Sequence, residues 1–435
     1  MLLFPESPQR LPQPRLRSVL IAGAQVLAVA AGAAVLLVRQ AGHPSWNTIF
    51  GEDASVFLPR ALLHPWSNLI QPWAGYIQLV PQFLADLISR LPLHDAAAGL
   101  AVTGCMVASG CALLVYNASA GHIRSRALRC LLAAAVVLLP VAPLEVAANA
   151  VDTPWYLIFA AFWALLWRPA SRGGPAAAAL VCFGAMSSQF VAVLLAPLVV
   201  ARVIALPRLR EQAPALGWLA GLAVQIPALL VQKPAQLRGS PMPALGFYAD
   251  HVLTAVLAGW RLSRALTQAA GGAQTALLAA VVVAALGTWA LVKGDGRLRM
   301  FIAAAVLFGL AAAVIPGTSR LWVVHLPSTA GWLPGSRYTV VPVLLLVSAG
   351  IVAVDAYLRR PGSHRAAAAR AMAVVLLVTV LGAGWVADFR YYTARSGYQP
   401  WSRTVSSFDQ SCRPRPPSVY IPSLRVSLPC SLAGS

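Results

Sequence analysis

Long runs of apolar residues, separated by short polar segments, occupy most of this chain. The first run covers 18–38, and ten more follow between 96 and 388. A helix needs about 17–25 apolar residues to cross a bilayer. The pattern therefore predicts an all-α, polytopic membrane protein with about eleven transmembrane helices, at 18–38, 96–116, 130–147, 153–167, 175–186, 190–206, 214–232, 272–292, 300–316, 338–358 and 371–388.

Two of these runs leave an alternative open. Ser187, Ser188 and Gln189 separate 175–186 from 190–206, and the first of the two is short for a full span. They form either two spans or a broken, partly re-entrant hairpin.

Composition supports a membrane protein. The chain is 59% hydrophobic and 11% charged, with a mean hydropathy of +0.71, whereas soluble domains carry about 25% charged residues. The net charge of +20 is spread over many short loops instead of one patch, which argues against a nucleic-acid partner.

The basic residues predict the orientation. Their clusters fall on alternate loops, on the same side as the N-terminus, and short basic loops stay in the cytoplasm. The run 18–38 is longer than the apolar part of a signal peptide, so it is expected to be retained as a helix. We therefore expect a multi-pass protein of the cell (plasma) membrane, with the N-terminus cytoplasmic and the C-terminus extracytoplasmic. The clusters are Arg124, Arg126 and Arg129; Arg168 and Arg172; Arg202, Arg208 and Arg210; Lys293, Arg297 and Arg299; and Arg359, Arg360, Arg365 and Arg370.

Most of the acidic residues then fall on the outer side, where the first outer loop is long. Within it, Phe57–Leu63 and Leu79–Leu91 have apolar residues at helical spacing, with Trp66 and Trp73 between them. This pattern is typical of amphipathic helices that lie on the membrane surface. The predicted organisation is a transmembrane domain at 1–388, in which the loop 39–95 carries the candidate active site, and a short extracytoplasmic tail at 389–435.

The cysteines fall into two groups. Cys412 and Cys430 lie in the polar tail, and the other four lie in or beside apolar runs. An extracytoplasmic tail is in an oxidising compartment, which favours a disulfide between Cys412 and Cys430.

Glu52 and Asp53 form the first candidate site, in a chain that has only 13 acidic residues. Neighbouring carboxylates repel, which favours a raised pKa for one of them. Such a group can act as a general base towards a hydroxyl. Together the two could instead hold a divalent cation (Mg²⁺, Mn²⁺ or Ca²⁺). The alternative without chemistry is a solvated turn with Asp53 as the N-cap of the next helix.

Two further groups of residues lie at predicted helix ends. Glu145 and Asn149, four residues apart, are expected on one helical face, with Asp152 and Trp155 just beyond them. An acid this close to an apolar core is often functional, although a water-exposed helix end would also tolerate it.

The other group is Arg337 and Tyr338, which precede the tenth span. An interfacial arginine can hold a phosphate through two parallel hydrogen bonds, and a tyrosine can add a third. The same pair could instead be a simple anchor at the membrane surface.

These features resemble the GT-C superfamily of membrane glycosyltransferases, of the actinobacterial type. The resemblance covers about 18–388 and lies in the acidic pair of the first outer loop, the segment from Glu145 to Trp155, and Arg337 with Tyr338. It implies a GT-C-like fold in which Asp53 is the catalytic base and Glu52 its partner or a metal ligand. Arg337 and Tyr338 would face the donor phosphate.

The resemblance also implies an activity. A sugar would pass with inversion from a polyprenyl-phosphate donor to a hydroxyl of a glycan or glycolipid acceptor, on the outer face of the membrane. This would serve cell-envelope glycan or glycolipid assembly. Membrane lipid would be the other partner.

The alternative is a multi-pass transporter or lipid flippase. Coupled transporters usually carry ionisable groups near the middle of the bilayer, where this sequence has almost none.

Overall fold

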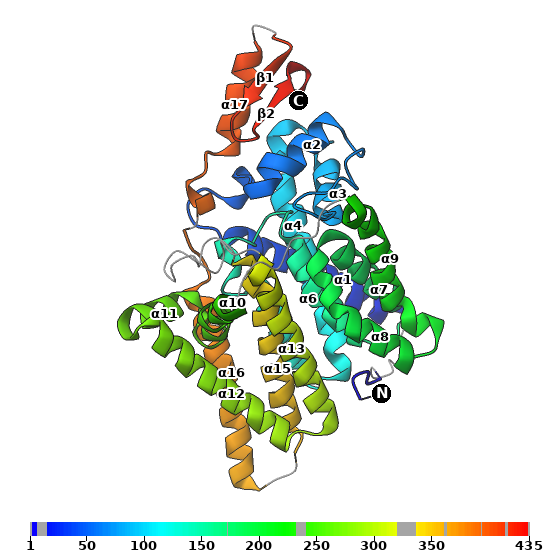
Figure 1. The fold of residues 1–435 in the computed structure, drawn as a ribbon, viewed down its shortest axis with the longest axis vertical. Helices are drawn as coiled ribbons and strands as arrows, with labels where there is room; N and C mark the ends of the chain where they lie inside the picture. Colours follow the sequence, from blue (N-terminus) through cyan, green and yellow to red (C-terminus); the bar gives the residue numbers. More distant parts are fainter. Residues whose placement is uncertain are drawn as a thin grey trace.

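In the part of the chain that it describes, the computed structural model consists of helices and connecting turns, with one small β-hairpin (Figure 1). It describes residues 2–6, 15–171, 173–231, 241–319, 336–360, 363–392, 394–413 and 416–433. Among these, eight segments are helical, long and apolar enough to cross a membrane. This confirms an all-α protein with several membrane-spanning helices. Six of them are single helices: α1 (Arg15–Val38), α9 (Leu209–Val231), α12 (Gly272–Lys293), α13 (Gly296–Ser319), α15 (Arg337–Leu358) and α16 (His364–Ala387). The other two are α4 (Ala96–Ala118) with its flanking 3₁₀ turns, over Leu93–Gly121, and α5 (Arg126–Val137) with the turns that follow it, over Arg126–Leu144.

Three shorter apolar helices occupy the remaining predicted spans. They are α6 (Thr153–Leu166), α7 (Gly174–Ser188) and α8 (Ala196–Ala205). The chain between α7 and α8 leaves helical geometry at Gln189 (φ −151°, ψ 116°) and continues as a 3₁₀ turn, Phe190–Leu195. The predicted break at Ser187–Gln189 is therefore confirmed, and 175–206 is an interrupted pair of helices.

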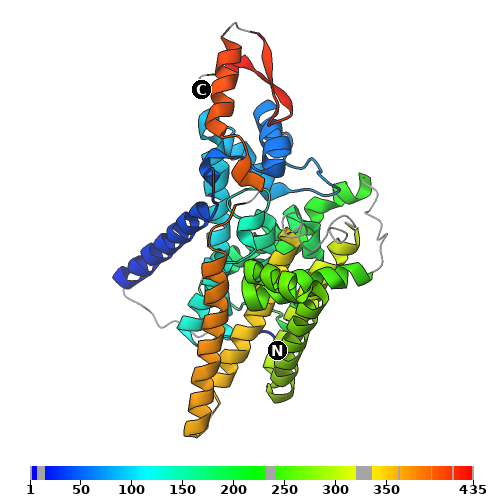
Figure 2. The ribbon, with the colours of Figure 1, turned by 90° about the vertical axis from the view of Figure 1, so that its left-hand side faces the viewer.

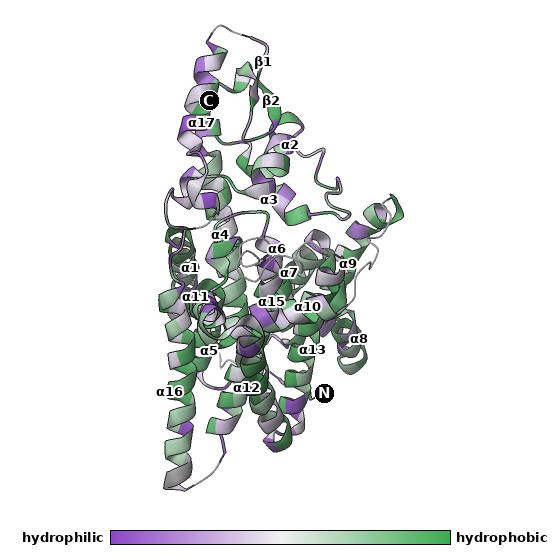
Figure 3. Ribbon diagram, turned by 60° about the vertical axis from the view of Figure 1, so that its left-hand side comes forward, coloured by the Kyte–Doolittle hydropathy of each residue, from purple (hydrophilic) through white to green (hydrophobic). Residues whose placement is uncertain are grey.

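Burial separates a central pair of helices from peripheral ones. Every residue of α6 is buried, and 72% of the most apolar 18-residue stretch of α15 is buried. In α1 and α16, only 11% of the most apolar stretch is buried. A helix that is apolar on all sides yet exposed in the protein suits contact with lipid. Figure 3 shows these apolar surfaces along the lower helices, below a more polar upper region.

The predicted span 130–147 is wrong at its C-terminal end. Helix α5 stops at Val137, and the chain continues through a 3₁₀ turn at Ala142–Leu144. Proline has no N–H and clashes with the preceding turn of a helix, so Pro140 and Pro143 end the regular structure. Glu145 and Asn149 consequently do not share a helical face. They lie in a series of irregular turns that leads to α6.

The first loop is built from short helices, as predicted. A 3₁₀ turn (Ser45–Asn47) leads to a π-helical turn (Asp53–Phe57), which runs directly into α2 (Leu58–Leu63). Helix α3 (Leu79–Ile88) follows, and a 3₁₀ turn at Leu93–Asp95 opens α4. The helices predicted at 57–63 and 79–91 are both present, the second slightly shorter.

A third region of short helices precedes α12. It consists of α10 (Pro241–Phe247), a π-helical turn (Tyr248–Leu253) and α11 (Thr254–Ala270), which kinks at Gly259. The Asp388 carboxylate accepts hydrogen bonds from the N–H groups of Trp260 and Arg261 at this kink. These bonds fix the end of α16 against α11.

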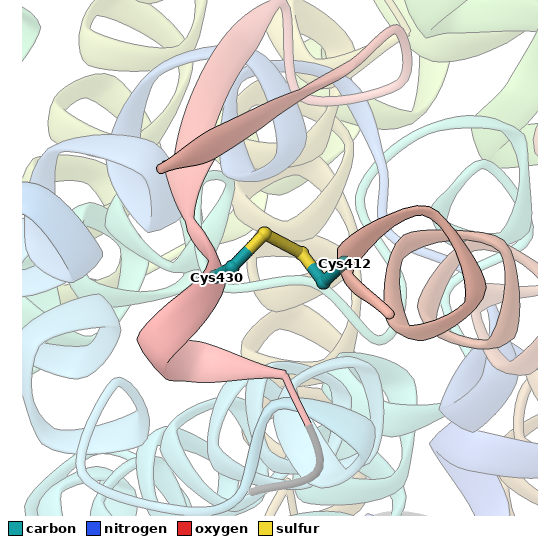
Figure 4. The surroundings of a disulfide bond; sticks show 2 residues. All are labelled: Cys412 and Cys430. Atoms are coloured by element: carbon teal, nitrogen blue, oxygen red, sulfur yellow. A yellow bond between two sulfur atoms is a disulfide. The ribbon is translucent and has the colours of Figure 1, made fainter. Parts of the chain in front are cut away.

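The C-terminal tail is folded. A 3₁₀ turn (Ala394–Gly397) leads to α17 (Trp401–Cys412), and strands β1 (Ser418–Ile421) and β2 (Val426–Pro429) form an antiparallel hairpin with Ser418 opposite Pro429. A last 3₁₀ turn covers Cys430–Leu432. The predicted disulfide between Cys412 and Cys430 is present and ties the end of α17 to the chain after β2 (Figure 4).

The tail and the first loop share a second apolar core, separate from the core of the bundle. Phe57, Leu84 and Leu100 on one side pack with Phe408 and Leu428 on the other. Figure 1 shows α17 and the hairpin standing above α2 and α3, at the end of the molecule opposite the lower ends of α13, α15 and α16. We call this upper end, formed by 39–95 and 394–433, the loop end.

Loops predicted to be cytoplasmic meet at the other end. Arg168 pairs with Glu6 at 3.1 Å and with Glu211 at 2.8 Å, and the Asp355 carboxylate accepts from the Arg124 N–H at 3.1 Å. Figure 2 places the N-terminus in this lower part of the molecule and the C-terminus at the top. The grouping agrees with the alternation of loops in the sequence. Which end faces the cytoplasm remains a prediction.

Candidate functional site

Arg337, the first residue of α15, lies among three carboxylates at the loop end. Its Nη1 is 3.6 Å from Glu52 Oε1 and 4.0 Å from Asp152 Oδ1, and its Nε is 3.5 Å from Glu145 Oε1. The three acids come from the first loop, from the turns after α5, and from the residue before α6. The structure thus brings together Glu52, Glu145, Asp152 and Arg337, which are far apart in the sequence.

Glu145 is held at the N-terminus of α15. Its Oε2 accepts hydrogen bonds from the Arg337 N–H at 3.1 Å and from the Ser336 hydroxyl at 3.2 Å. The first N–H groups of a helix have no partner within the helix and favour an anion there. Glu145 therefore satisfies one of these N–H groups while its Oε1 faces the Arg337 side chain.

The turns from Glu145 to Asp152 are held by Asn149. Its Nδ2 donates to Glu145 O at 2.6 Å, and its Oδ1 accepts from the Asp152 N–H at 2.9 Å. Ala148 has φ +57°, a conformation that costs a residue with a Cβ about 1 kcal/mol or more. Asn149, which the sequence predicts to line the site, thus bonds to the backbone of the acidic residues on either side of it in the chain, Glu145 and Asp152.

Asp53 is fixed against the same turns. Its Oδ2 accepts the Ala150 N–H at 2.8 Å, and its side chain is 1% exposed. The alternatives of a solvated turn and of a helix N-cap are therefore wrong for Asp53, because the carboxylate is buried and bonds to a residue 97 positions away. Among the described residues, none donates a hydrogen bond to its Oδ1.

The carboxylate cluster is Glu52, Asp53, Glu145 and Asp152, and burial changes its protonation. Burial, with the negative charge of Glu145 as a second cause, raises the pKa of Asp152 well above its usual value. Burial also raises the pKa of Asp53 to about 7, although the N–H groups of Ala150 and Val151 and the Arg395 guanidinium oppose this shift. Part of the cluster therefore keeps its protons near neutral pH.

Arg395, in the tail, is a residue that the sequence did not single out. Its guanidinium donates to the carbonyls of Ala147 and Ala148 at 3.2 and 2.8 Å, and to those of Ser45 and Thr48 at 2.9 Å each. Burial lowers its pKa to about 10, although the Asp53 charge opposes the shift. Arg395 thus joins the tail, the first loop and the strained turn at Ala148. No motif surrounds it in the sequence, so only tertiary structure reveals it.

The predicted aromatic residues lie beneath the cluster. Tyr338 is buried and packs edge-to-face with Trp155, with 5.3 Å between the ring centroids. The Arg337 guanidinium lies 5.7 Å from the centroid of the Tyr338 ring. A ring face attracts a cation, so these two rings support the position of Arg337. Because Tyr338 is buried and Arg337 faces carboxylates, the pair does not have the geometry of an open anchor at the membrane surface.

A divalent-metal site is the other prediction for Glu52 and Asp53. Within the described parts of the chain, no three His, Cys, Asp or Glu side chains are grouped so that they could hold a metal ion. The two carboxylates point differently, one toward Arg337 and one toward Ala150. They do not fit a resident ion by themselves, so a divalent cation stays a prediction that needs further oxygen ligands.

A close approach of α4 positions the turns that hold Asp53. A Cβ placed on Gly104 would lie 2.1 Å from Asn149 O, whereas one placed on Gly110, six residues further along α4, would meet nothing within 4 Å. Only glycine therefore allows the Asn149–Ala150 backbone to pack directly on this helix.

We expect Gly104→Ala to lower the free energy of unfolding by about 1–3 kcal/mol, the usual cost of forcing atoms into a packed site. Gly110→Ala, the matched control, should leave it unchanged or raise it by up to about 1 kcal/mol, because alanine is the better helix former. Thermal unfolding of both variants in the same detergent measures the difference. Equal midpoints would contradict the close contact of Gly104 with Asn149.

The comparisons with known proteins add no family to these observations. No protein-family model matches the chain, and no curated protein matches it either. The chemistry of the site therefore has to be inferred from its own residues and their geometry.

Proposed function

We propose that this protein is a membrane glycosyltransferase of the GT-C type. It transfers a sugar, with inversion, from a polyprenyl-phosphate donor to an acceptor hydroxyl at the loop end. The observation that carries the proposal is the cluster of four carboxyl groups, three of which face Arg337, with Asp53 as the fourth and poised to titrate near neutral pH. The cluster would supply acid–base groups, and Arg337 a phosphate-binding group, at one end of an apolar bundle.

The position of the cluster favours an enzyme over a transporter. Asp53 and Glu52 lie in the first loop, Glu145 and Asp152 in the turns between α5 and α6, and Arg337 at the first residue of α15. Ion-coupled transporters place such groups near the middle of the bilayer. A cluster at the ends of the helices instead suits a reaction at the membrane surface, where a lipid phosphate and a polar acceptor can meet.

Arg337 is the group that would receive the donor phosphate. Arginine binds phosphate oxygens through a planar fork of N–H donors. Three carboxylates already face its guanidinium, and a phosphate adds more negative charge. Binding therefore needs either retained protons, as the raised pKa of Asp152 provides, or a divalent cation shared with the phosphate.

Asp53 is the proposed base. A general base works best when its pKa lies near the operating pH, and burial brings the pKa of Asp53 to about 7. Its Oδ2 is engaged by Ala150, which leaves Oδ1 for an acceptor hydroxyl. Because the side chain is 1% exposed, substrate binding has to uncover Oδ1 before proton transfer.

The bond changes are those of a single displacement. The acceptor oxygen forms a bond to C1 of the sugar and gives its proton to Asp53, while the bond from C1 to the phosphate oxygen breaks on the opposite face. One displacement inverts the anomeric centre, as in inverting glycosidases. The leaving polyprenyl phosphate is stabilised by the positive charge of Arg337 and needs no general acid.

Asp53→Asn tests the base. Asparagine keeps an oxygen that can accept the Ala150 N–H but cannot take a proton, so turnover should fall by at least about 100-fold. Glu52→Gln should lose less, because Glu52 faces Arg337 and acts as a partner. The measurement is sugar transfer by the purified variants from a polyprenyl-phosphate donor. Near-normal transfer by Asp53→Asn would remove Asp53 from the mechanism, and a larger loss in Glu52→Gln would make Glu52 the base.

The pH profile follows from the same group. Asp53 accepts a proton only when it is ionised. Burial raises its pKa from 3.8 to about 7, so a large ionised fraction requires a pH of about 7 or above. Below pH 7, kcat/KM should therefore fall, approaching about tenfold per pH unit, and above it should level off. A rate profile between about pH 5 and 9 measures this. A profile that is flat down to about pH 5 would show that the base has an ordinary carboxylate pKa.

Arg337→Lys separates phosphate binding from a general need for positive charge. Lysine keeps the charge but loses the fork, so KM for the donor should rise by about tenfold, the equivalent of one charge-assisted hydrogen bond. Arg403→Lys, on the exposed side of α17, is the control and should change nothing. An unchanged donor KM in Arg337→Lys would assign Arg337 to structure alone.

A further inference from the structure

A cavity of about 550 Å³ opens between the first loop and the tail. Its lining comes from the chain around Glu52, from Trp73, from the segment that starts α17, and from the turn between β1 and β2. Cavities of about 300–1,000 Å³ are the usual size for a small ligand. The cavity is therefore large enough for a site, and two distant parts of the sequence, the first loop and the tail, build it.

The walls of this cavity are fixed to one another. Asn47 exchanges two hydrogen bonds with Ser402, at 2.9 and 3.2 Å, and the Trp401 indole N–H donates to Leu93 O at 2.8 Å. Arg395 adds its bonds to Ser45 and Thr48. The tail is thus attached to the first loop through residues next to the cavity lining, and the disulfide closes the tail on itself. A ligand would meet a preformed surface.

Glu52 belongs to both the cavity and the carboxylate cluster. It lines the cavity wall together with Gly51, Ala54 and Ser55, and its Oε1 also faces Arg337. The residues on either side of Asp53 therefore form part of the wall. A molecule in the cavity would lie directly beside the segment that carries the proposed base.

The lining combines aromatic rings with hydrogen-bonding side chains and a few aliphatic ones. Trp73, Tyr398 and Trp401 supply rings, Gln399, Ser423 and Arg425 supply hydrogen-bonding groups, and Ile49, Pro422 and Leu424 are apolar. Tyr398 stacks on Phe50 at 6.2 Å between ring centroids, which fixes its orientation. Arg425 has φ +54°, a conformation that is costly for a residue with a side chain. Residues in such strained conformations are found more often than average at ligand sites.

This combination fits a carbohydrate. A sugar ring presents C–H groups on its faces and hydroxyl groups around its edge, so it packs on an aromatic face while its hydroxyls bond to polar side chains. A lipid chain would need an apolar lining throughout. The elements that line the cavity belong to the loop end, which lies above the mostly hydrophobic helices of the bundle (Figure 3).

We infer that this cavity binds the sugar end of the acceptor, so that the acceptor is an oligosaccharide or the glycan of a glycolipid. The inference rests on the proposed function for the role of the ligand as acceptor, but the presence of a carbohydrate site does not depend on catalysis. The tail then takes part in the reaction by selecting the hydroxyl that meets Asp53.

Binding without turnover tests the site. The purified full-length protein is applied, in detergent and without donor, to an array of gluco-, manno-, galacto- and arabino-oligosaccharides. We expect one class to bind. Tyr398→Ala should weaken that binding by about tenfold, the value of one well-packed aromatic contact, and Tyr398→Phe should restore it. Tyr420→Ala is the matched control, since Tyr420 is an exposed tyrosine of the same tail that does not line the cavity.

The outcomes separate this inference from the proposed function. Failure of the wild-type protein to bind any carbohydrate, or equal binding by Tyr398→Ala and Tyr420→Ala, would overturn the site. Selective loss in Tyr398→Ala would support it, even if no donor were turned over. Sugar transfer that is insensitive to Tyr398→Ala would leave the enzyme standing and place the acceptor elsewhere.

Discussion

The enclosure of four carboxyl groups with Arg337 at the end of an apolar bundle is the constraint on which much of this structure depends. Removing charges from water is costly unless each is paired, hydrogen-bonded or neutralised. The fold uses all three solutions. Arg337 faces three of the acids, backbone N–H groups reach Glu145 and Asp53, and burial favours protonation of Asp152. Stability and chemistry therefore come from the same contacts.

A second arginine connects this cluster to the rest of the loop end. Arg395 donates hydrogen bonds to carbonyls of both the first loop and the turn at Ala148. Two residues after Ala148, the Ala150 N–H donates to the Asp53 carboxylate. The tail is thus part of the support of the site. The second apolar core and the disulfide have the same effect, because they hold the tail over the first loop.

The sequence predicted much of the fold and the membership of the cluster, for identifiable reasons. A charged residue is rare in so apolar a chain, so Glu52, Asp53, Glu145 and Arg337 stood out. Their proximity was not predictable from spacing, since tertiary packing brings them together. Arg395 was missed because nothing local distinguishes it among the arginines of the tail. The four-residue strands β1 and β2 are too short to give a pattern.

The central claim is that the cluster transfers a sugar from a lipid phosphate. The most direct measurement is incubation of the purified wild-type protein with a panel of polyprenyl-phosphate sugars and oligosaccharide acceptors, with detection of released polyprenyl phosphate and of the anomeric configuration of the product. The account predicts release from at least one donor, together with a product of inverted configuration. Release of no lipid phosphate from any donor, or a product with retained configuration, would contradict it.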